Sequence, residues 1–242
     1  MQANTKYLSV SVWRGDVRAG ELQQFQVPQQ ENQTILDLVT WIQREIDPGL
    51  SYRFSCRVGM CGSCAMTING IPRWACRTHV QKVVKHNSLT IEPLRNLPVI
   101  RDLVCDMSEF FARWKQAEGQ FRGDTSRDES VVRLSPDSPG RQLANAAIEC
   151  INCAICYAAC DVVSWNESYL GPAALNRAWS LLNDERDRYQ LPRLKAVASG
   201  AGCYNCHSHQ SCARYCPNEL NPTASIAGLK RMATMAALKG EL

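Results

Sequence analysis

The sequence predicts an α+β protein of two domains, in which a sheet comes first and helices follow. The 242 residues include 45% hydrophobic side chains, enough for two cores of ordinary size. Apolar residues alternate near the N-terminus, as in half-buried strands, but recur at helical spacing after residue 170. The thirteen cysteines form three groups of four, and one more lies between the first two groups. One group in the first domain and two in the second would account for this pattern.

Composition excludes several classes of protein. The formal net charge of +4, from 27 basic and 23 acidic side chains, is too small for a protein that coats a polyanion, and no nucleic-acid partner is expected. An odd number of cysteines cannot all pair within one chain, which favours a reducing compartment. The N-terminus resembles neither a secretory signal nor a transit peptide, and no apolar run reaches the roughly 20 residues of a membrane span. A soluble or peripheral bacterial protein is expected, although an imported chain without its presequence would look the same.

The first elements are predicted to be a hairpin and a helix. Leu8, Val10 and Val12 share one face of a strand, and the alternation resumes at residues 25 and 27 after a turn-prone segment. Thr34 then begins a capping box with Asp37, and apolar residues at helical spacing follow as far as Asp47-Pro48-Gly49.

The first cysteine group predicts a 2Fe-2S cluster. Cys56, Cys61 and Cys64 have the spacing of a plant-type ferredoxin, in which a fourth thiolate completes the cluster. Asn69-Gly70 is a strong hairpin signal that would bring Cys76 back beside Cys64, and Gly59 and Gly62 suit a loop that approaches a cluster closely. We expect a β-grasp, plant-type ferredoxin-like domain over residues 1–115.

This domain is expected to end in a helix. Apolar residues from Val99 to Trp114 follow a helical stripe, and Cys105 lies off that stripe with no neighbouring ligand, so it is interpreted as a bystander. Residues 116–140, rich in Gly, Pro and charge, are the expected linker.

The remaining residues, 141–242, predict a helical domain with two clusters. The first run, from Cys150 to Cys160, has the spacing of bacterial ferredoxins, in which the fourth cysteine binds the other cluster. The second run, from Cys206, has only two cysteines before its final Cys216-Pro217. If the two runs exchange their last cysteines, they give one 4Fe-4S set: Cys150, Cys153, Cys156 and Cys216. It leaves three thiolates, which suit a 3Fe-4S cluster: Cys160, Cys206 and Cys212. Helices are expected from Gly171-Pro172 to Leu182 and from about Pro222 to Leu238.

These motifs, in this order, resemble the iron-sulfur subunit of succinate dehydrogenases and fumarate reductases. The similarity rests on Ser51–Cys56 with Cys61–Cys64, on Trp74–Cys76, on Cys150–Cys160 and on Cys216–Pro222, and it covers essentially the whole chain. It implies single-electron transfer through the three clusters, between the flavin of an FAD-containing dicarboxylate oxidoreductase subunit and a quinone at a membrane anchor that can carry haem b. It also implies a peripheral place on the cytoplasmic face of the bacterial inner membrane, and a quinone site at Trp165 and His207.

Three residues depart from the family pattern. Asp161 replaces a common proline, where its carboxylate would oppose reduction of the third cluster or relay a proton. His209 fills the vacant ligand position of the second run, and Cys203 adds a thiol before Cys206. Either could supply a fourth ligand and make the third centre 4Fe-4S, whereas the preferred assignment is 3Fe-4S.

Two other functions remain open from the sequence. One is an electron-relay subunit of a different flavoprotein dehydrogenase, and the other is a free-standing ferredoxin-like carrier. No residue is interpreted as an acid or base for dicarboxylate chemistry, so no catalytic residue is expected in this chain.

Overall fold

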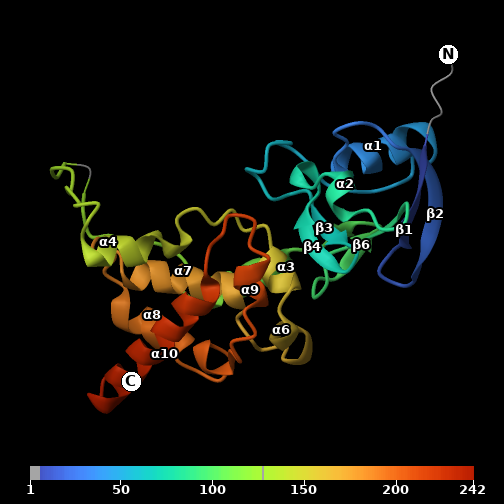
Figure 1. The fold of residues 1–242 in the computed structure, drawn as a ribbon. Helices are drawn as coiled ribbons and strands as arrows, with labels where there is room; N and C mark the ends of the chain where they lie inside the picture. Colours follow the sequence, from blue (N-terminus) through green and yellow to red (C-terminus); the bar gives the residue numbers. More distant parts are fainter. Residues whose placement is uncertain (1–5, 127) are drawn as a thin grey trace. The chain divides into compact units, whose positions relative to one another are not determined.

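The computed structural model describes residues 6–126 and 128–242 and divides the chain into two compact units (Figure 1). The first unit comprises residues up to Met107 together with Ile151–Ala158, and the second comprises Ser108–Cys150 and Ala159–Leu242. Residue 127 of the predicted linker lies outside the described residues. None of the helices in the described ranges is long and apolar enough to cross a membrane.

A five-stranded sheet forms the centre of the first unit, in the order β2-β1-β5-β3-β4. Its strands are β1 (Tyr7–Gly15), β2 (Gly20–Pro28), β3 (Ala65–Ile68), β4 (Ile71–Trp74) and β5 (Ser88–Glu92). The strands β1 and β5 run parallel and the other pairs antiparallel. The alternation in β1 is confirmed, since Leu8, Val10 and Val12 are fully buried.

The helix α1 (Ile35–Glu45) begins as predicted. The Thr34 side chain accepts a hydrogen bond from the Asp37 backbone N–H, and the Asp37 carboxylate accepts one from the Thr34 N–H, which completes the capping box. Buried Ile35, Leu38 and Ile42 face the core of this unit. A short helix α2 (Val80–Val83) and a 3₁₀ turn η1 (Ala75–Arg77) connect β4 to β5.

The predicted helix over 99–114 is wrong in its first half. Residues Val99–Arg101 (β6) and Val104–Cys105 (β7) form a small hairpin, and the helix α3 runs only from Ser108 to Gln116. The apolar residues over this range recur at helical spacing, but they belong to two short strands. Asp102, at the turn, has a left-handed backbone with φ of 49°.

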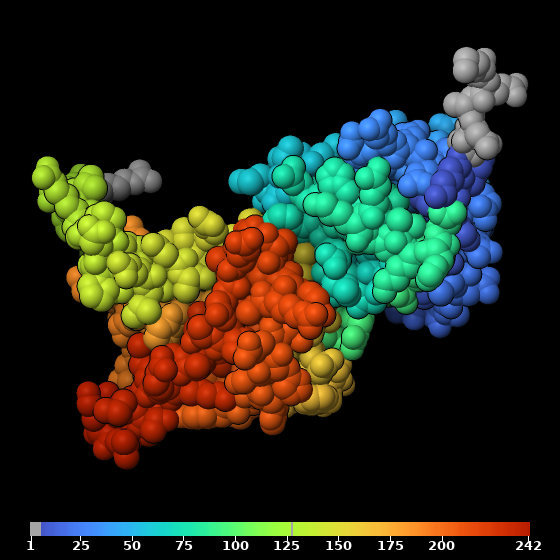
Figure 2. Space-filling model, in the orientation of Figure 1, coloured from blue at the N-terminus to red at the C-terminus, as the bar shows by residue number. Residues whose placement is uncertain are grey.

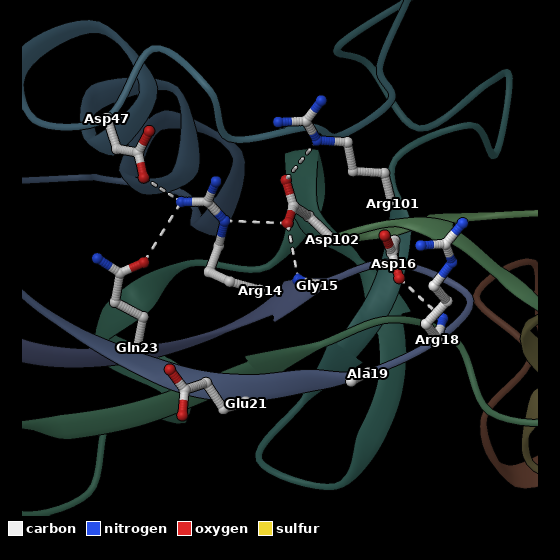
Figure 3. Close-up of a pocket in the computed structure, with 10 residues that line it drawn as sticks. All are labelled: Arg14, Gly15, Asp16, Arg18, Ala19, Glu21, Gln23, Asp47, Arg101 and Asp102. Carbon is white, nitrogen blue, oxygen red and sulfur yellow. Dashed lines mark hydrogen bonds and ion pairs between the residues drawn. The ribbon is translucent and has the colours of Figure 1, made fainter.

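Long-range polar contacts explain this turn (Figure 3). The buried Asp102 carboxylate accepts hydrogen bonds from Arg14 Nε at 3.0 Å, from the Gly15 N–H at 3.0 Å and from the Ser51 N–H at 2.8 Å. Arg14 also pairs with Asp47, and this hydrogen bond lowers the pKa of Asp47. The cleft drawn in Figure 3 is therefore lined by charged groups that stabilise one another within the first unit.

The second unit is built around α7 (Pro172–Leu182), in which ten of the eleven residues are buried. The helix α10 (Pro222–Leu238) packs on α7, and the bounds of both helices confirm the prediction. A Cβ placed on Gly228 would lie 2.4 Å from the Trp179 ring, so glycine permits the two helices to approach.

Shorter helices complete this unit: α4 (Pro139–Ala144), α6 (Asp161–Trp165), α8 (Gln190–Val197) and α9 (Ser211–Arg214), with the 3₁₀ turns η2 (Asn145–Ala147) and η3 (Cys203–Asn205). A further short helix, α5 (Ile155–Ala158), belongs to the first unit.

The segment before α4, described over residues 120–126 and 128–138, is irregular and lies at the surface of the second unit (Figure 2). Arg193 of α8 holds the beginning of this segment in place. Its Nη1 lies 2.6 Å from Asp187 Oδ1 in an ion pair whose two side chains are fully buried. Arg193 also donates to the carbonyls of Glu118 and Gln120, each at 2.8 Å. Because water is excluded from this buried site, the charge-assisted hydrogen bonds are strong, and they hold the chain after α3 against α8.

Candidate iron-sulfur sites

The first site is the loop from Cys56 to Cys64, which ends where β3 begins. Gly59 and Gly62 have left-handed backbones, with φ of 77° and 70°, and Arg57 has φ of 59°. Such residues turn successive N–H groups toward one side of a loop. The N–H groups of Met60 and Cys61 donate to Cys56 Sγ at 3.2 and 3.3 Å, respectively.

The β3–β4 hairpin brings the fourth cysteine to this loop. Ile68 pairs with Ile71 across the Asn69-Gly70 turn, as predicted, and the Ala75 N–H donates to the Cys64 carbonyl at 3.1 Å. The structure thus places Cys76 beside Cys64.

The thiols of this group differ in acidity. A hydrogen bond from the Ser63 hydroxyl, 3.0 Å from Cys61 Sγ, is the main cause that lowers the pKa of Cys61 to about 6. Burial raises the pKa of Cys64 to about 12. Because thiolate is the form that binds iron, Cys61 is ready to bind, while a buried thiolate at Cys64 requires positive charge such as iron provides. Four thiols, with N–H groups directed at the sulfur of Cys56 and a hydroxyl beside that of Cys61, fit a 2Fe-2S cluster.

The second group begins close to the first. Residues 151–158 belong to the first unit, and a Cβ on Gly62 would lie only 2.5 Å from Cys153 Cβ. Asn152 and Ala154 have left-handed backbones, with φ of 54° and 60°, so this loop is also tightly turned around Cys153. Cys153 and Cys156 are both partly exposed.

The other two members of the predicted 4Fe-4S set lie in the second unit. The Asn218 side-chain amide donates to the Glu149 carbonyl. Asn218 lies two residues after Cys216, and Glu149 lies next to Cys150. The hydrogen bond therefore joins the segments that carry these two cysteines.

The third site is a small cavity within the second unit. Its walls include all three cysteines predicted for the third cluster: Cys160, Cys206 and Cys212. Cys160 is the last cysteine of the first run, and the structure brings it to the second run, as the exchange pattern requires. Burial raises the pKa of both Cys160 and Cys212.

Hydrogen-bond donors surround these sulfurs. The Ser208 N–H donates to Cys206 Sγ at 3.4 Å, and Thr223 Oγ1 lies 3.2 Å from Cys212 Sγ. Ser208 and Gln210 have left-handed backbones, with φ of 58° and 65°. The donor set fits a cluster held by three thiolates.

The predicted quinone residues lie together at this cavity. His207 and His209 line it, and the Trp165 ring, 59% exposed, lies 6.3 Å from the His207 ring and 5.9 Å from the His209 ring between centroids. His209 Nδ1 is 3.8 Å from Asp161 Oδ2. These four side chains form an aromatic and polar corner beside the third site.

The two candidates for a fourth ligand differ in position. His209 lines the cavity, with 45% of its side chain exposed. Cys203 is fully buried in η3, is not among the cavity residues, and has its pKa raised to about 11 by burial. Among the described residues, no group of three or more His, Cys, Asp or Glu side chains is arranged to hold a single metal ion.

Sequence reasoning missed two hydroxyl groups at this cavity, those of Tyr169 and Thr223. Neither lies in a cysteine run. The single sequence signal is indirect: each residue stands close to the proline that begins a helix, Pro172 for α7 and Pro222 for α10.

Comparison with known proteins agrees with these sites. Residues 9–112 match a family model described as a 2Fe-2S iron-sulfur cluster binding domain, and residues 149–221 match one described as a 4Fe-4S dicluster domain. The mitochondrial succinate dehydrogenase [ubiquinone] iron-sulfur subunit 1 of Oryza sativa subsp. japonica is 35% identical over 234 residues, covering 95% of this chain and 83% of the relative. The chain belongs to the succinate dehydrogenase iron-sulfur subunit family.

Further relatives agree with this membership. Iron-sulfur subunit 2 of the same plant is 36% identical over 82% of this chain and 64% of that relative. A chain of the Mycobacterium smegmatis Sdh1 complex in the apo form has a TM-score of 0.85 at 27% identity, covering 96% of this chain and 97% of the other. A hypothetical protein from Helicobacter pylori shares the fold, with a TM-score of 0.60 at 18% identity over 96% of this chain and 40% of its own.

The membership confirms the expected fold class and function. This iron-sulfur subunit is α+β, with a 2Fe-2S ferredoxin-like domain followed by a dicluster domain. It is the electron-relay subunit of an oxidoreductase of the succinate dehydrogenase type. Its cofactors are the 2Fe-2S, 4Fe-4S and 3Fe-4S clusters.

Proposed function

We propose that each cluster of this iron-sulfur subunit is held by the cysteine set expected from the cysteine spacing, and that electrons leave the chain at Trp165 and His207. Cys56, Cys61, Cys64 and Cys76 hold the 2Fe-2S cluster. Cys150, Cys153, Cys156 and Cys216 hold the 4Fe-4S cluster, and Cys160, Cys206 and Cys212 hold the 3Fe-4S cluster. The observation that carries the proposal is that Cys160, from the first run, lines one cavity with Cys206 and Cys212.

When bound, the clusters supply one-electron redox chemistry, and the protein supplies their ligands and surroundings. The N–H groups of Met60, Cys61 and Ser208 point at ligand sulfurs, where they stabilise the negative charge that reduction adds. The close approach of Gly62 to Cys153 supports direct passage of electrons from the first site to the second.

At the end of the relay, the corner of Trp165, His207 and His209 suits a quinone. The exposed Trp165 indole offers an apolar face and an N–H donor, and a histidine beside the cavity can donate a hydrogen bond to a quinone oxygen. The 3Fe-4S assignment leaves His209 outside the ligand set, where its contact with Asp161 gives this corner a polar side.

The proposed partners follow from the family. They are an FAD-containing subunit that carries out the dicarboxylate chemistry and a membrane anchor that binds quinone and can carry haem b. The proposed location is the cytoplasmic face of the bacterial inner membrane. The domains proposed are residues 1–115 for the 2Fe-2S cluster and 141–242 for the other two clusters, joined by residues 116–140.

The proposal is tested by isolating the tagged chain from gently solubilised membranes and measuring succinate-dependent quinone reduction. His207→Gln is expected to slow quinone reduction while leaving electron transfer from succinate to an acceptor that takes electrons from the flavin. His86→Gln, at an exposed histidine of the first unit, is the matched control and should behave as the unaltered protein. Isolation of the chain without a flavoprotein, or equal activity in both variants, would contradict the proposal.

A further inference from the structure

Arg113 is an arginine of α3 that is buried in the second unit, with only 6% of the residue exposed. The sequence analysis gave it no role. A guanidinium stays charged in proteins, so it is found out of water only where hydrogen-bond acceptors surround it. The identity of those acceptors therefore indicates what Arg113 holds in place.

Two of these acceptors lie in the loop between α6 and α7. Arg113 Nη1 donates to the Tyr169 carbonyl at 2.7 Å, and Arg113 Nη2 donates to the Glu167 carbonyl at 2.5 Å. Arg113 Nε donates to the Glu109 carboxylate, one turn earlier in α3, at 2.8 Å. The planar guanidinium thus binds two carbonyls of one loop with a fixed geometry that the flexible ammonium of a lysine does not provide.

This loop is also held by other contacts. The Ser168 N–H and hydroxyl both donate to Asn166 Oδ1, at 2.9 and 2.7 Å, respectively. The Tyr169 N–H donates to the Asn166 carbonyl at 3.1 Å, and the Leu170 N–H donates to the Ala201 carbonyl at 2.8 Å. The loop is therefore a tight turn, held by α3 on one side and by the segment that leads to the second cysteine run on the other.

Trp165 depends on this loop for its position. It is the last residue of α6, a helix of only five residues that directly follows Cys160, and Asn166 is the cap at the end of this helix. Trp165 is 59% exposed, so packing alone does not fix its ring. The backbone on either side of α6 decides where the ring lies, and the loop bound by Arg113 forms one of these two sides.

We propose that Arg113 is a positioning residue of the quinone site: its hydrogen bonds hold the loop after α6 and thereby keep the Trp165 ring beside His207. The inference rests on the quinone site of the proposed function. Arg113 is not among the residues that line the cavity, so it acts through the backbone of the loop. Without its hydrogen bonds the loop samples arrangements that do not bind quinone, and the apparent affinity falls with the fraction of molecules that remain competent.

This role predicts a change in KM for quinone with little change in kcat. If one molecule in about ten remains competent, KM rises about tenfold. Saturating quinone selects the competent arrangement, in which Trp165 and His207 lie as in the unaltered protein, so electron transfer at saturation is retained. Electron transfer from succinate to an acceptor at the flavin does not pass through this site and should not change.

The test is a steady-state assay of the intact complex carrying Arg113→Gln, with quinone as the varied substrate. KM for quinone is expected to rise about tenfold, with kcat within about twofold of the unaltered value. Arg141→Gln is the matched control, because Arg141 is also a buried arginine of the second unit but pairs with Asp184. Both variants are expected to lower thermal stability, and only Arg113→Gln should change KM.

Two further variants separate the hydrogen bonds of Arg113 from its charge. Arg113→Lys keeps the charge without the planar fork, so an intermediate KM is expected. Glu109→Gln leaves both carbonyl contacts, so KM should stay near the unaltered value.

An unchanged KM in Arg113→Gln, or complete restoration of KM by lysine, would overturn the inference. If Arg113→Gln does not assemble, Arg113→Lys carries the test, and loss of assembly in both variants would show a purely structural role and also overturn it. Failure of the proposed function is distinguishable, because it appears in His207→Gln. If that variant reduces quinone normally, the quinone site lies elsewhere and the inference falls with it.

Discussion

Gly62 offers the sharpest test of the packing between the first two cysteine groups. In Gly62→Ala the added methyl would lie 2.5 Å from Cys153 Cβ and 2.9 Å from Cys153 Cα, at a residue with φ of +70°. Carbon atoms pack best at about 3.5–4.0 Å, so one of the two loops must move by about 1 Å. The atoms in the way belong to the backbone and the first side-chain carbon, which cannot rotate aside.

Two costs add in this variant. A left-handed alanine costs roughly 1–2 kcal/mol relative to glycine, and overpacking costs about 1–3 kcal/mol more. Gly70→Ala isolates the first cost, because Gly70 has a similar φ of +77° and no atom within 4 Å of the added Cβ. Gly62→Ala should therefore be about 1–3 kcal/mol less stable than Gly70→Ala.

The assay is thermal unfolding of the purified complex, with EPR of the 2Fe-2S cluster as a local probe. For a chain of this size each 1 kcal/mol lowers the midpoint temperature by about 2–4 °C. Gly62→Ala should also change the 2Fe-2S spectrum, because the displaced loop carries Cys61 and Cys64. Equal midpoint temperatures for the two variants, with identical spectra, would refute the argued contact between Gly62 and Cys153.

Other predictions concern the clusters and stability. Cys160→Ser should remove the 3Fe-4S EPR signal and leave the 4Fe-4S signal, although the residue stands in the first run; loss of the 4Fe-4S signal instead would contradict the exchange. The chain should contain about nine iron atoms, whereas about ten, without the 3Fe-4S signal, would show a fourth ligand at the third cluster. Asp184, whose pKa is lowered chiefly by its hydrogen bond with Arg186, should stabilise the fold above the usual aspartate pKa and lose this contribution as the pH falls toward its lower folded value. In Asp184→Asn, acid unfolding monitored by circular dichroism should therefore begin from a lower stability at neutral pH and depend less on pH; an unchanged profile would contradict this. Thr34→Ala should cost about 1 kcal/mol in chemical denaturation through loss of the cap, and an unchanged stability would contradict a role for this cap.

Local signals predicted most of the fold. The capping box at Thr34, the Asn69-Gly70 turn and the helix from Pro222 were all confirmed, because each depends on residues a few positions apart. The prediction of a helix from Val99 was wrong for the opposite reason. The turn between β6 and β7 depends on Asp102, whose partners Arg14, Gly15 and Ser51 lie far away in the sequence.

The candidate sites divide in the same way. Cysteine spacing indicated which thiols belong together, since ligand geometry is encoded in short loops. The burial of Tyr169 could not be predicted, because it depends on where α7 and the second cysteine run meet in the folded unit. For the same reason, spacing placed Cys203 and His209 on an equal footing, whereas in the structure only His209 of these two lines the cavity.

The meeting of Cys160 with Cys206 and Cys212 also bears on how the protein matures. In an unfolded chain, joining Cys160 to the second run closes a loop of about 45 residues, at an entropic cost of roughly 3–4 kcal/mol. Joining Cys150 and its neighbours to Cys216 closes a slightly longer loop around the same segment. The insertion of the first cluster overcomes most of this entropic cost. The second cluster then forms in a chain whose two cysteine runs are already close together. Insertion of the two clusters into the unaltered chain is therefore expected to be cooperative, because the first cluster makes the second easier to insert, whereas in Cys160→Ser the 4Fe-4S cluster meets the whole cost by itself.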